Sequence, residues 1–151
     1  MNLNNNLILL YDNFLLKEDC DKYINVFKKE KDKIKQYRDT FTLKIKDVAL
    51  LNKLKSEFNI DKLLTPDNLE IVMWPKNSFM DLHYDNKDTI AFIIYLNEDY
   101  IGWETIIDKK TIEPKTGRVV IFSNGRLEHS VNKIQEGTRY TLIGWYVWVI
   151  K

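Results

Sequence analysis

The sequence predicts a mainly β protein of the α+β class, built as a sandwich or a closed jelly roll with helices packed on one of its sheets. Two observations support this prediction. In the first third of the chain, apolar residues recur with helical spacing, whereas beyond Pro66 they alternate with polar residues at a period of two. The alternating part divides into seven or eight short strands separated by turn residues, which is the spacing of an antiparallel sandwich or barrel.

The N-terminal part is expected to hold a strand, two helices and a second strand. Leu7–Tyr11 is a short apolar run typical of a strand. From about Lys17 to Gln36 apolar residues lie at i, i+3 and i+4, which predicts a helix whose acidic first turn suits the helix dipole. Phe41–Ile45 alternates and predicts a strand, and Asp47 is placed to cap a second helix that runs toward Phe58.

Beyond these elements the periodicity changes from 3.6 to 2, which predicts strands. The turns that separate the strands are rich in proline, asparagine, aspartate and glycine, which interrupt regular pairing. The predicted strands are Leu69–Trp74, Phe79–Asp85, Ile90–Leu96, Trp103–Ile107, Arg118–Phe122, Glu128–Lys133 and Tyr140–Ile150. The N-terminal helices are expected to pack on one face of the sheet that these strands form.

The length of 151 residues predicts a single domain over residues 1–151, helical to about residue 65 and β from about residue 66. The net charge of +1 gives no general attraction to nucleic acid or to an anionic membrane. Cys20 is the only cysteine, which excludes an internal disulfide framework and a zinc site of the CxxC type. Leu7–Tyr11 is too short to span a bilayer and lacks the basic flank of a signal peptide, so we expect a cytoplasmic protein.

Two histidines and one aspartate form the candidate metal site. His83 and Asp85 lie two residues apart on a predicted strand, so their side chains point to the same face. His129, the only other histidine, lies on a later strand. Two histidines and a carboxylate make the facial triad of non-haem Fe(II) oxygenases, which leaves coordination positions open for a chelating co-substrate and O2. The H-x-D spacing alone is a weak signal, because paired histidines more often have a structural role.

Arg139 is the second candidate site residue. We expect Glu136-Gly137 to turn the chain, so that the strand opening at Arg139 pairs with the strand of His129 and brings the guanidinium to the metal's side. Residues 139, 141, 143 and 145 then face the interior. A buried guanidinium needs an anion, and a carboxylate can accept two parallel hydrogen bonds from it. A dicarboxylic acid shaped like 2-oxoglutarate would reach from the metal to Arg139, whereas a salt bridge at the rim is the structural alternative.

Several segments, in order and spacing, resemble the prolyl hydroxylase group of the 2-oxoglutarate- and Fe(II)-dependent dioxygenases. The similar segments are Asp12–Leu15, Leu69–Pro75, His83–Asn86, Ile93–Asn97, Pro114–Phe122, His129–Val131 and Gly137–Tyr140. The resemblance covers most of the chain. It implies a double-stranded β-helix, a cupin-like jelly roll, over about residues 66–151, with at least two N-terminal helices packed against its larger sheet.

The resemblance also implies roles for five residues. His83, Asp85 and His129 match the iron ligands of the group. Arg139 matches the base that binds the distal carboxylate of 2-oxoglutarate, and Tyr95 matches a tyrosine whose hydroxyl supports the same carboxylate.

Further positions near the site follow from the same resemblance. Trp74 stands where related proteins carry a tyrosine near the iron, and an indole N–H can only donate a hydrogen bond. Trp145 resembles a tryptophan that walls the iron pocket, with core packing as the alternative. Trp103 replaces the second glycine of a Gly-Gly-Glu-Thr motif, and Thr105 in that motif is a candidate contact for the co-substrate. Arg126, shortly before the second histidine, is a candidate substrate contact.

The activity implied is hydroxylation of an unactivated C–H bond with Fe(II), 2-oxoglutarate, O2 and the accessory reductant ascorbate, releasing succinate and CO2. The expected substrate is a prolyl residue of a peptide or protein, bound by loops 36–41, 74–81 and 124–128. Two alternatives stay open. One is an oxidative nucleic-acid demethylase, against which the net charge of +1 counts. The other is a non-catalytic jelly-roll module whose triad binds a structural or sensory metal; conversion of 2-oxoglutarate to succinate distinguishes an enzyme from it.

Overall fold

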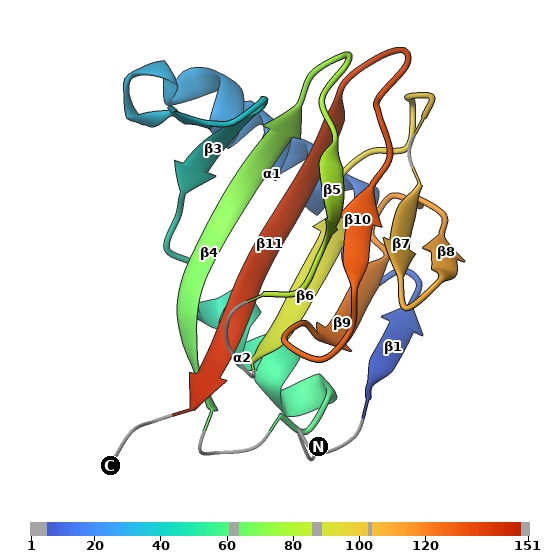
Figure 1. Cartoon of the computed structure of the whole chain (residues 1–151). Helices are drawn as coiled ribbons and strands as arrows, with labels where there is room; N and C mark the ends of the chain where they lie inside the picture. The colour runs from blue at the N-terminus through green and yellow to red at the C-terminus, as the bar shows by residue number, and fades with distance from the viewer. Residues whose placement is uncertain (1–5, 61–63, 86–88, 103, 149–151) are drawn as a thin grey trace.

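Two antiparallel sheets dominate the computed structural model, which describes residues 6–60, 64–85, 89–102 and 104–148 (Figure 1). The seven-stranded sheet has the order β1-β9-β6-β11-β4-β3-β2, and the four-stranded sheet has the order β5-β10-β7-β8. The strands are β1 (Ile8–Tyr11), β2 (Lys35–Tyr37), β3 (Thr40–Lys44), β4 (Leu64–Trp74), β5 (Met80–His83), β6 (Ile90–Tyr95), β7 (Thr105–Ile107), β8 (Lys110–Ile112), β9 (Val119–Ser123), β10 (His129–Val131) and β11 (Arg139–Trp148). The mainly β class expected from the sequence is confirmed.

Two helices, α1 (Lys17–Lys29) and α2 (Val48–Glu57), pack against the outer face of the seven-stranded sheet (Figure 1). Buried side chains of α1 and α2 share one apolar cluster with the outward-facing side chains of the sheet, which are Leu43, Leu69, Ile71, Phe92, Ile94, Val119, Ile121, Leu142 and Tyr146. The expected packing of two helices on the larger sheet is therefore present. Neither helix in the described part of the chain has the length and apolarity needed to cross a bilayer.

The first helix ends earlier than the sequence predicted. α1 stops at Lys29, and a 3₁₀ turn, η1 (Lys31–Lys33), leads into β2 in place of the helix expected to continue to Gln36. Residues 28–33 carry no apolar side chain, so a further helical turn there would bury nothing. Ile34 reaches the helix-side core from an extended conformation instead. The hairpin β2–β3 that results forms one edge of the seven-stranded sheet.

Every strand predicted from the sequence is present, but several ends differ and the sequence did not predict β2 or β8. β4 begins at Leu64 rather than at Leu69, because its whole length pairs with the long strand β11. β8 was not expected from the sequence; Asp108 and Lys109 both adopt positive φ, which closes a two-residue turn between β7 and β8 without a glycine. Trp103, the first residue of one predicted strand, and Ile150, the last residue of another, lie outside the described residues.

Side chains of the seven-stranded sheet alternate between its two covered faces. On β6, Phe92 and Ile94 face the helices, whereas Ala91 and Tyr95 belong to the apolar cluster on the other side of the sheet. Buried residues of the four-stranded sheet, such as Ile107, join that inner cluster. Both faces of the larger sheet are therefore buried, one against helices and one against the smaller sheet.

The pairing of the last strand differs from the expectation. β11 lies between β4 and β6 in the seven-stranded sheet, and not beside β10, which pairs with β5 and β7. The chain between β10 and β11 passes from the smaller sheet to the larger one, and Gly137 turns there with a φ of 81°. The alternation nevertheless directs residues 139, 141, 143 and 145 inward, where all four line one cavity.

Loss of the Asp47 carboxylate is expected to destabilise the fold. Asp47 accepts a hydrogen bond from the Leu50 amide at 3.0 Å, which caps α2, and one from the Tyr23 hydroxyl at 2.6 Å, which ties α2 to α1. Asp47→Ala should lower the free energy of unfolding by about 1–2 kcal/mol. Asp47→Asn, which keeps a capping oxygen, should cost less in the same urea titration. Equal stability of wild type and both variants would contradict this role.

Candidate active site

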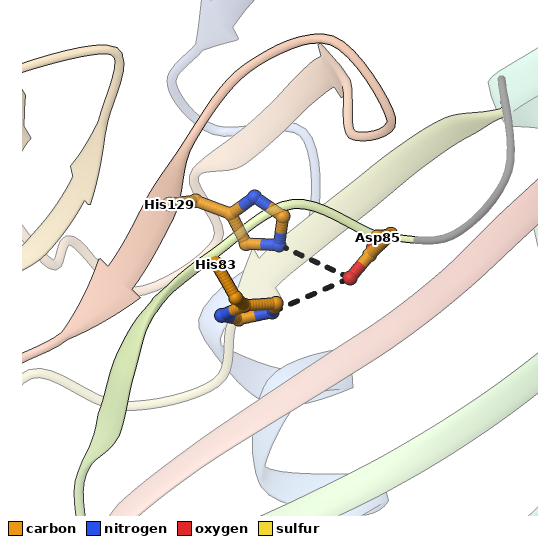
Figure 2. Close-up of side chains that lie close together, drawn as sticks. All are labelled: His83, Asp85 and His129. Carbon is orange, nitrogen blue, oxygen red and sulfur yellow. Dashed lines mark ion pairs between the residues drawn. The ribbon is translucent and has the colours of Figure 1, made fainter.

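His83, Asp85 and His129 converge at the open end of the four-stranded sheet (Figure 2). β5 and β10 are antiparallel, and their register sets His129 directly opposite His83. The Nε2 atoms of His83 and His129 lie 3.3 Å and 3.4 Å from Oδ1 of Asp85. One potential ligand atom from each residue lies within 4.8 Å of the others, which is close enough for a single metal ion to bind all three.

The two imidazoles are oriented by backbone carbonyls. Nδ1 of His83 lies 2.7 Å from the oxygen of Asp81, and Nδ1 of His129 lies 2.9 Å from the oxygen of Leu127. A neutral imidazole that donates from Nδ1 presents the lone pair of Nε2 to a metal. Both Nε2 atoms point toward Asp85 (Figure 2). Asp85 keeps 29% of its side chain exposed, so solvent and ligands can reach the triad.

The ionised state of Asp85 suits a cation. Burial raises the pKa of the Asp85 carboxyl, but the hydrogen bonds with His129 and Asn124 outweigh burial and hold that pKa below its usual value. Burial lowers the pKa of the His129 imidazole, whereas its bond to Asp85 raises it, and the net direction is upward. The ionised carboxylate thus attracts positive charge at the point where the two Nε2 atoms meet. This nitrogen and oxygen donor set suits a divalent transition metal such as Fe(II).

Asn124 supports the triad, a role that the sequence does not predict because an Asn-Gly pair is typical of a turn. Its Nδ2 donates to Oδ2 of Asp85 at 2.5 Å, and the Asp85 amide donates to its backbone oxygen at 3.2 Å. The Thr89 hydroxyl donates to Oδ1 of Asn124 at 2.6 Å, which fixes the amide so that its N–H groups face the carboxylate. The side chain therefore leaves Oδ1 of Asp85 free to bind a metal.

Arg139 is the largest fully buried side chain of the described residues, with 1% of its surface exposed. Its guanidinium carbon lies 4.9 Å from the centroid of a Trp74 ring and 5.4 Å from that of the Tyr95 ring. Nε and Nη1 have no hydrogen-bond partner in the structure. A buried cation with unpaired donors is strongly destabilising unless an anion binds it. The surroundings of Arg139 therefore fit a carboxylate.

Of the other predicted co-substrate residues, Trp74 and Tyr95 lie beside this guanidinium. The Tyr95 hydroxyl donates to Oγ1 of Thr105 at 2.8 Å, and both residues are buried. Nε1 of Trp74 donates to Oγ1 of Thr141 at 3.4 Å, so the indole that replaces a phenol here bonds a neighbouring hydroxyl. Trp145 lies six residues after Arg139 on β11, and both side chains point to the inner face of the sheet.

One cavity of about 760 Å³ joins the metal triad to Arg139. Its lining includes Trp74, Thr105, Thr141 and Trp145, and it extends over the inner face of the hairpin β2–β3. Arg126 is exposed and does not line this cavity. Trp103, which stands in place of the second glycine of the Gly-Gly-Glu-Thr motif, lies outside the described residues.

The sequence from residue 69 to residue 147, just over half of the chain, matches the family described as the 2OG-Fe(II) oxygenase superfamily. The chain therefore belongs to this superfamily. Its cofactors are those expected from the sequence, namely Fe(II), 2-oxoglutarate and O2; ascorbate stays a prediction. Among curated protein sequences, none matches this chain.

Solved structures with similar folds include prolyl hydroxylases. The viral collagen prolyl hydroxylase from Paramecium bursaria Chlorella virus-1, solved with 2OG, is 18% identical with a TM-score of 0.76, over 98% of this chain and 99% of that chain. A Pseudomonas putida prolyl-4-hydroxylase is 16% identical with a TM-score of 0.77, over 98% and 96% of the two chains. A Trichoplax adhaerens prolyl hydroxylase, in complex with a hypoxia inducible factor peptide fragment, is 17% identical with a TM-score of 0.75, over 95% and 84%. At these identities the likeness is one of fold.

Removal of the Asn124 amide is expected to weaken metal binding. Asn124→Ala leaves Oδ2 of Asp85 without its side-chain donor, so the carboxylate can turn away from the two Nε2 atoms. The affinity for Mn(II) or Co(II), measured in competition with a chromophoric chelator, should fall about 10- to 100-fold. Asn132→Ala is the matched control, because Asn132 is exposed and its amide donates to Glu104. An unchanged affinity in Asn124→Ala would remove this residue from the account of the site.

Proposed function

We propose that this protein is an Fe(II)- and 2-oxoglutarate-dependent dioxygenase that hydroxylates a prolyl residue of a peptide or protein. The observation that carries the proposal is the buried guanidinium of Arg139, with Nε and Nη1 unpaired, in the same cavity as the triad His83, Asp85 and His129. A metal-chelating dicarboxylate matches both ends of that cavity. Membership in the 2OG-Fe(II) oxygenase superfamily supports the reaction class.

The chain's own groups have separable tasks in this reaction. His83, Asp85 and His129 hold the iron on one side, which leaves its other side open to ligands. Arg139 binds the distal carboxylate of 2-oxoglutarate, and the hydrogen-bonded pair of Tyr95 and Thr105 lies beside it. When bound, iron, 2-oxoglutarate and O2 supply an oxidation that yields succinate, CO2 and a hydroxylated C–H bond.

Burial of the co-substrate pocket orients the reactants and limits access of water. Trp74 and Tyr95 are 5% and 0% exposed, and their rings flank the guanidinium of Arg139. A carboxylate bound there is shielded from solvent, which strengthens its attraction to the cation. The bound acid is then held in one orientation relative to the triad.

The architecture supports a double-stranded β-helix as the fold of a single catalytic domain. Two antiparallel sheets enclose the cavity, as expected for a jelly roll. The N-terminal part contributes β1, β2 and β3 to the seven-stranded sheet. The proposal therefore treats residues 1–151 as one unit.

A peptide substrate is supported by the extent of the cavity beyond the triad. The inner face of the hairpin β2–β3 lines it with Lys35, Tyr37, Thr40, Thr42 and Lys44. In the register of the sheet, Thr42 lies opposite Val72 and Lys44 opposite Glu70, so this face continues the inner face of β4. An extended peptide can lie along that polar face while one of its residues reaches the triad. Similarity of fold to prolyl hydroxylases, one of them bound to a peptide, favours a prolyl target.

Loss of the Arg139 guanidinium should weaken 2-oxoglutarate binding and leave metal binding nearly intact. A hydrogen bond to a charged group contributes about 1.5–3 kcal/mol, so Arg139→Ala should reduce the affinity about 10- to 100-fold for each bond lost. Calorimetric titration of the Mn(II)-loaded protein measures this change. Arg126→Ala is the control, because Arg126 is exposed and does not line the cavity. Equal affinity in wild type and Arg139→Ala would exclude Arg139 from the site.

The proposed activity is tested by succinate formation in the Fe(II)-loaded protein, with and without a peptide array. Prolyl peptides should stimulate succinate release and gain one oxygen atom by mass spectrometry, and His83→Ala should do neither because it loses a metal ligand. Methylated oligonucleotides form the comparison arm. Succinate release that only the oligonucleotides stimulate would support a 2-oxoglutarate-dependent oxygenase and would contradict a prolyl substrate. Absence of any succinate in aerobic Fe(II)-loaded protein would indicate a non-catalytic binding module.

A further inference from the structure

Tyr100 is a buried residue near Arg139 that the sequence analysis did not single out. It lies between β6 and β7, is 6% exposed, and shares an apolar cluster with Val72, Trp74 and Val131. Trp74 belongs to that cluster and also lies against the guanidinium of Arg139. Trp74 and Val131 line the cavity that holds the triad.

The backbone places Tyr100 beside the turn that leads into β11. The backbone amide of Ile101 donates to the oxygen of Glu136 at 2.9 Å, and the side-chain Nδ2 of Asn97 donates to the backbone oxygen of Thr138 at 2.7 Å. Gly137 lies against Tyr100 so closely that a Cβ atom there would be 3.0 Å from the Tyr100 Cβ and 3.1 Å from its Cα. The segments that carry Tyr100 and Arg139 therefore run alongside each other in a tightly packed arrangement.

The hydroxyl of Tyr100 has no hydrogen-bond partner. Among the described residues, the buried side-chain nitrogen and oxygen atoms without a partner are three, namely the Tyr100 hydroxyl and Nε and Nη1 of Arg139. Four other tyrosine hydroxyls have acceptors: Tyr23 with Asp47, Tyr84 with Glu128, Tyr95 with Thr105, and Tyr146 with the backbone oxygen of Leu51. A phenylalanine would fill the position of Tyr100 without an unpaired hydroxyl, so packing does not explain the phenol.

The charge of Arg139 acts on this hydroxyl. Burial raises the pKa of the Tyr100 phenol, and the positive charge of Arg139 opposes that increase. The phenol stays protonated and can donate a hydrogen bond. The three unpaired groups are thus all donors, and Trp74 connects the residues that carry them, because it shares a cluster with Tyr100 and lies against Arg139.

We infer that Tyr100 is a co-substrate-binding residue, whose hydroxyl donates a hydrogen bond to the distal carboxylate that Arg139 binds. A carboxylate can accept about four hydrogen bonds, so one such group satisfies the hydroxyl and both unpaired nitrogens together. The inference rests on the proposed function, because it takes the dicarboxylate to be 2-oxoglutarate. It adds a donor that lies outside the metal triad and outside the pair Tyr95 and Thr105.

Tyr100→Phe tests the inference in two measurements. In calorimetric titration of the Mn(II)-loaded protein, the affinity for 2-oxoglutarate should fall about tenfold or more, because a hydrogen bond to a charged acceptor is lost. In thermal unfolding without 2-oxoglutarate, the variant should be at least as stable as the wild type, because phenylalanine removes an unpaired buried hydroxyl. If the hydroxyl had a purely structural role, the affinity for 2-oxoglutarate would be unchanged and the variant would be less stable than the wild type.

Tyr140→Phe is the matched control. Tyr140 follows Arg139 on β11, but it packs in the helix-side cluster against Phe27, and its loss of a hydroxyl should leave the affinity for 2-oxoglutarate unchanged. Equal affinity in wild type and Tyr100→Phe, with the wild type binding 2-oxoglutarate, would overturn the role of Tyr100 alone. Failure of the wild type to bind 2-oxoglutarate at all would overturn the proposed function together with it.

Discussion

The architecture depends on the burial of both faces of the seven-stranded sheet. Helices α1 and α2 cover its outer face, and the four-stranded sheet covers its inner face. Because side chains alternate along each strand, the central strands β9, β6 and β11 must satisfy two buried environments at once. This constraint fixes which residues point into the cavity, so a shift of β11 by one residue would turn Arg139 from the cavity toward the helices.

Polar groups on the inner face are therefore exceptions that need an explanation. Thr105, Thr141 and Tyr95 form hydrogen bonds with neighbouring side chains, and they are compatible with a protein that binds nothing. Arg139 and Tyr100 keep unpaired donors in the interior, which folding alone would disfavour. A ligand that carries a carboxylate removes that penalty. The buried donors thus link the stability of the fold to occupation of the site.

Local patterns in the sequence predicted much of the site, and long-range pairing explains what they missed. The H-x-D spacing indicated that His83 and Asp85 share one site, and they do, although β5 ends at His83 and Asp85 lies beyond the strand. The period of two directed Arg139 inward, although β11 pairs with β4 and β6 rather than with β10. The strand β2 was missed because a lysine-rich segment without apolar spacing resembles the surface of a helix. Asn124 and Tyr100 contact residues that are distant in the sequence, such as Asp85 for Asn124 and Trp74 for Tyr100. The residues next to them in the sequence therefore do not indicate these contacts.

The central claim is that the buried guanidinium selects a second carboxylate on a metal-chelating 2-oxo acid. Titration of the Mn(II)-loaded protein with 2-oxoglutarate and with 2-oxopentanoate tests it directly, because the two acids have the same chain length and only the first has a distal carboxylate. Leaving a buried charge unpaired costs about 2–5 kcal/mol, so 2-oxoglutarate should bind at least about thirtyfold more tightly. Equal affinities for the two acids would contradict the assignment of Arg139 and of 2-oxoglutarate together.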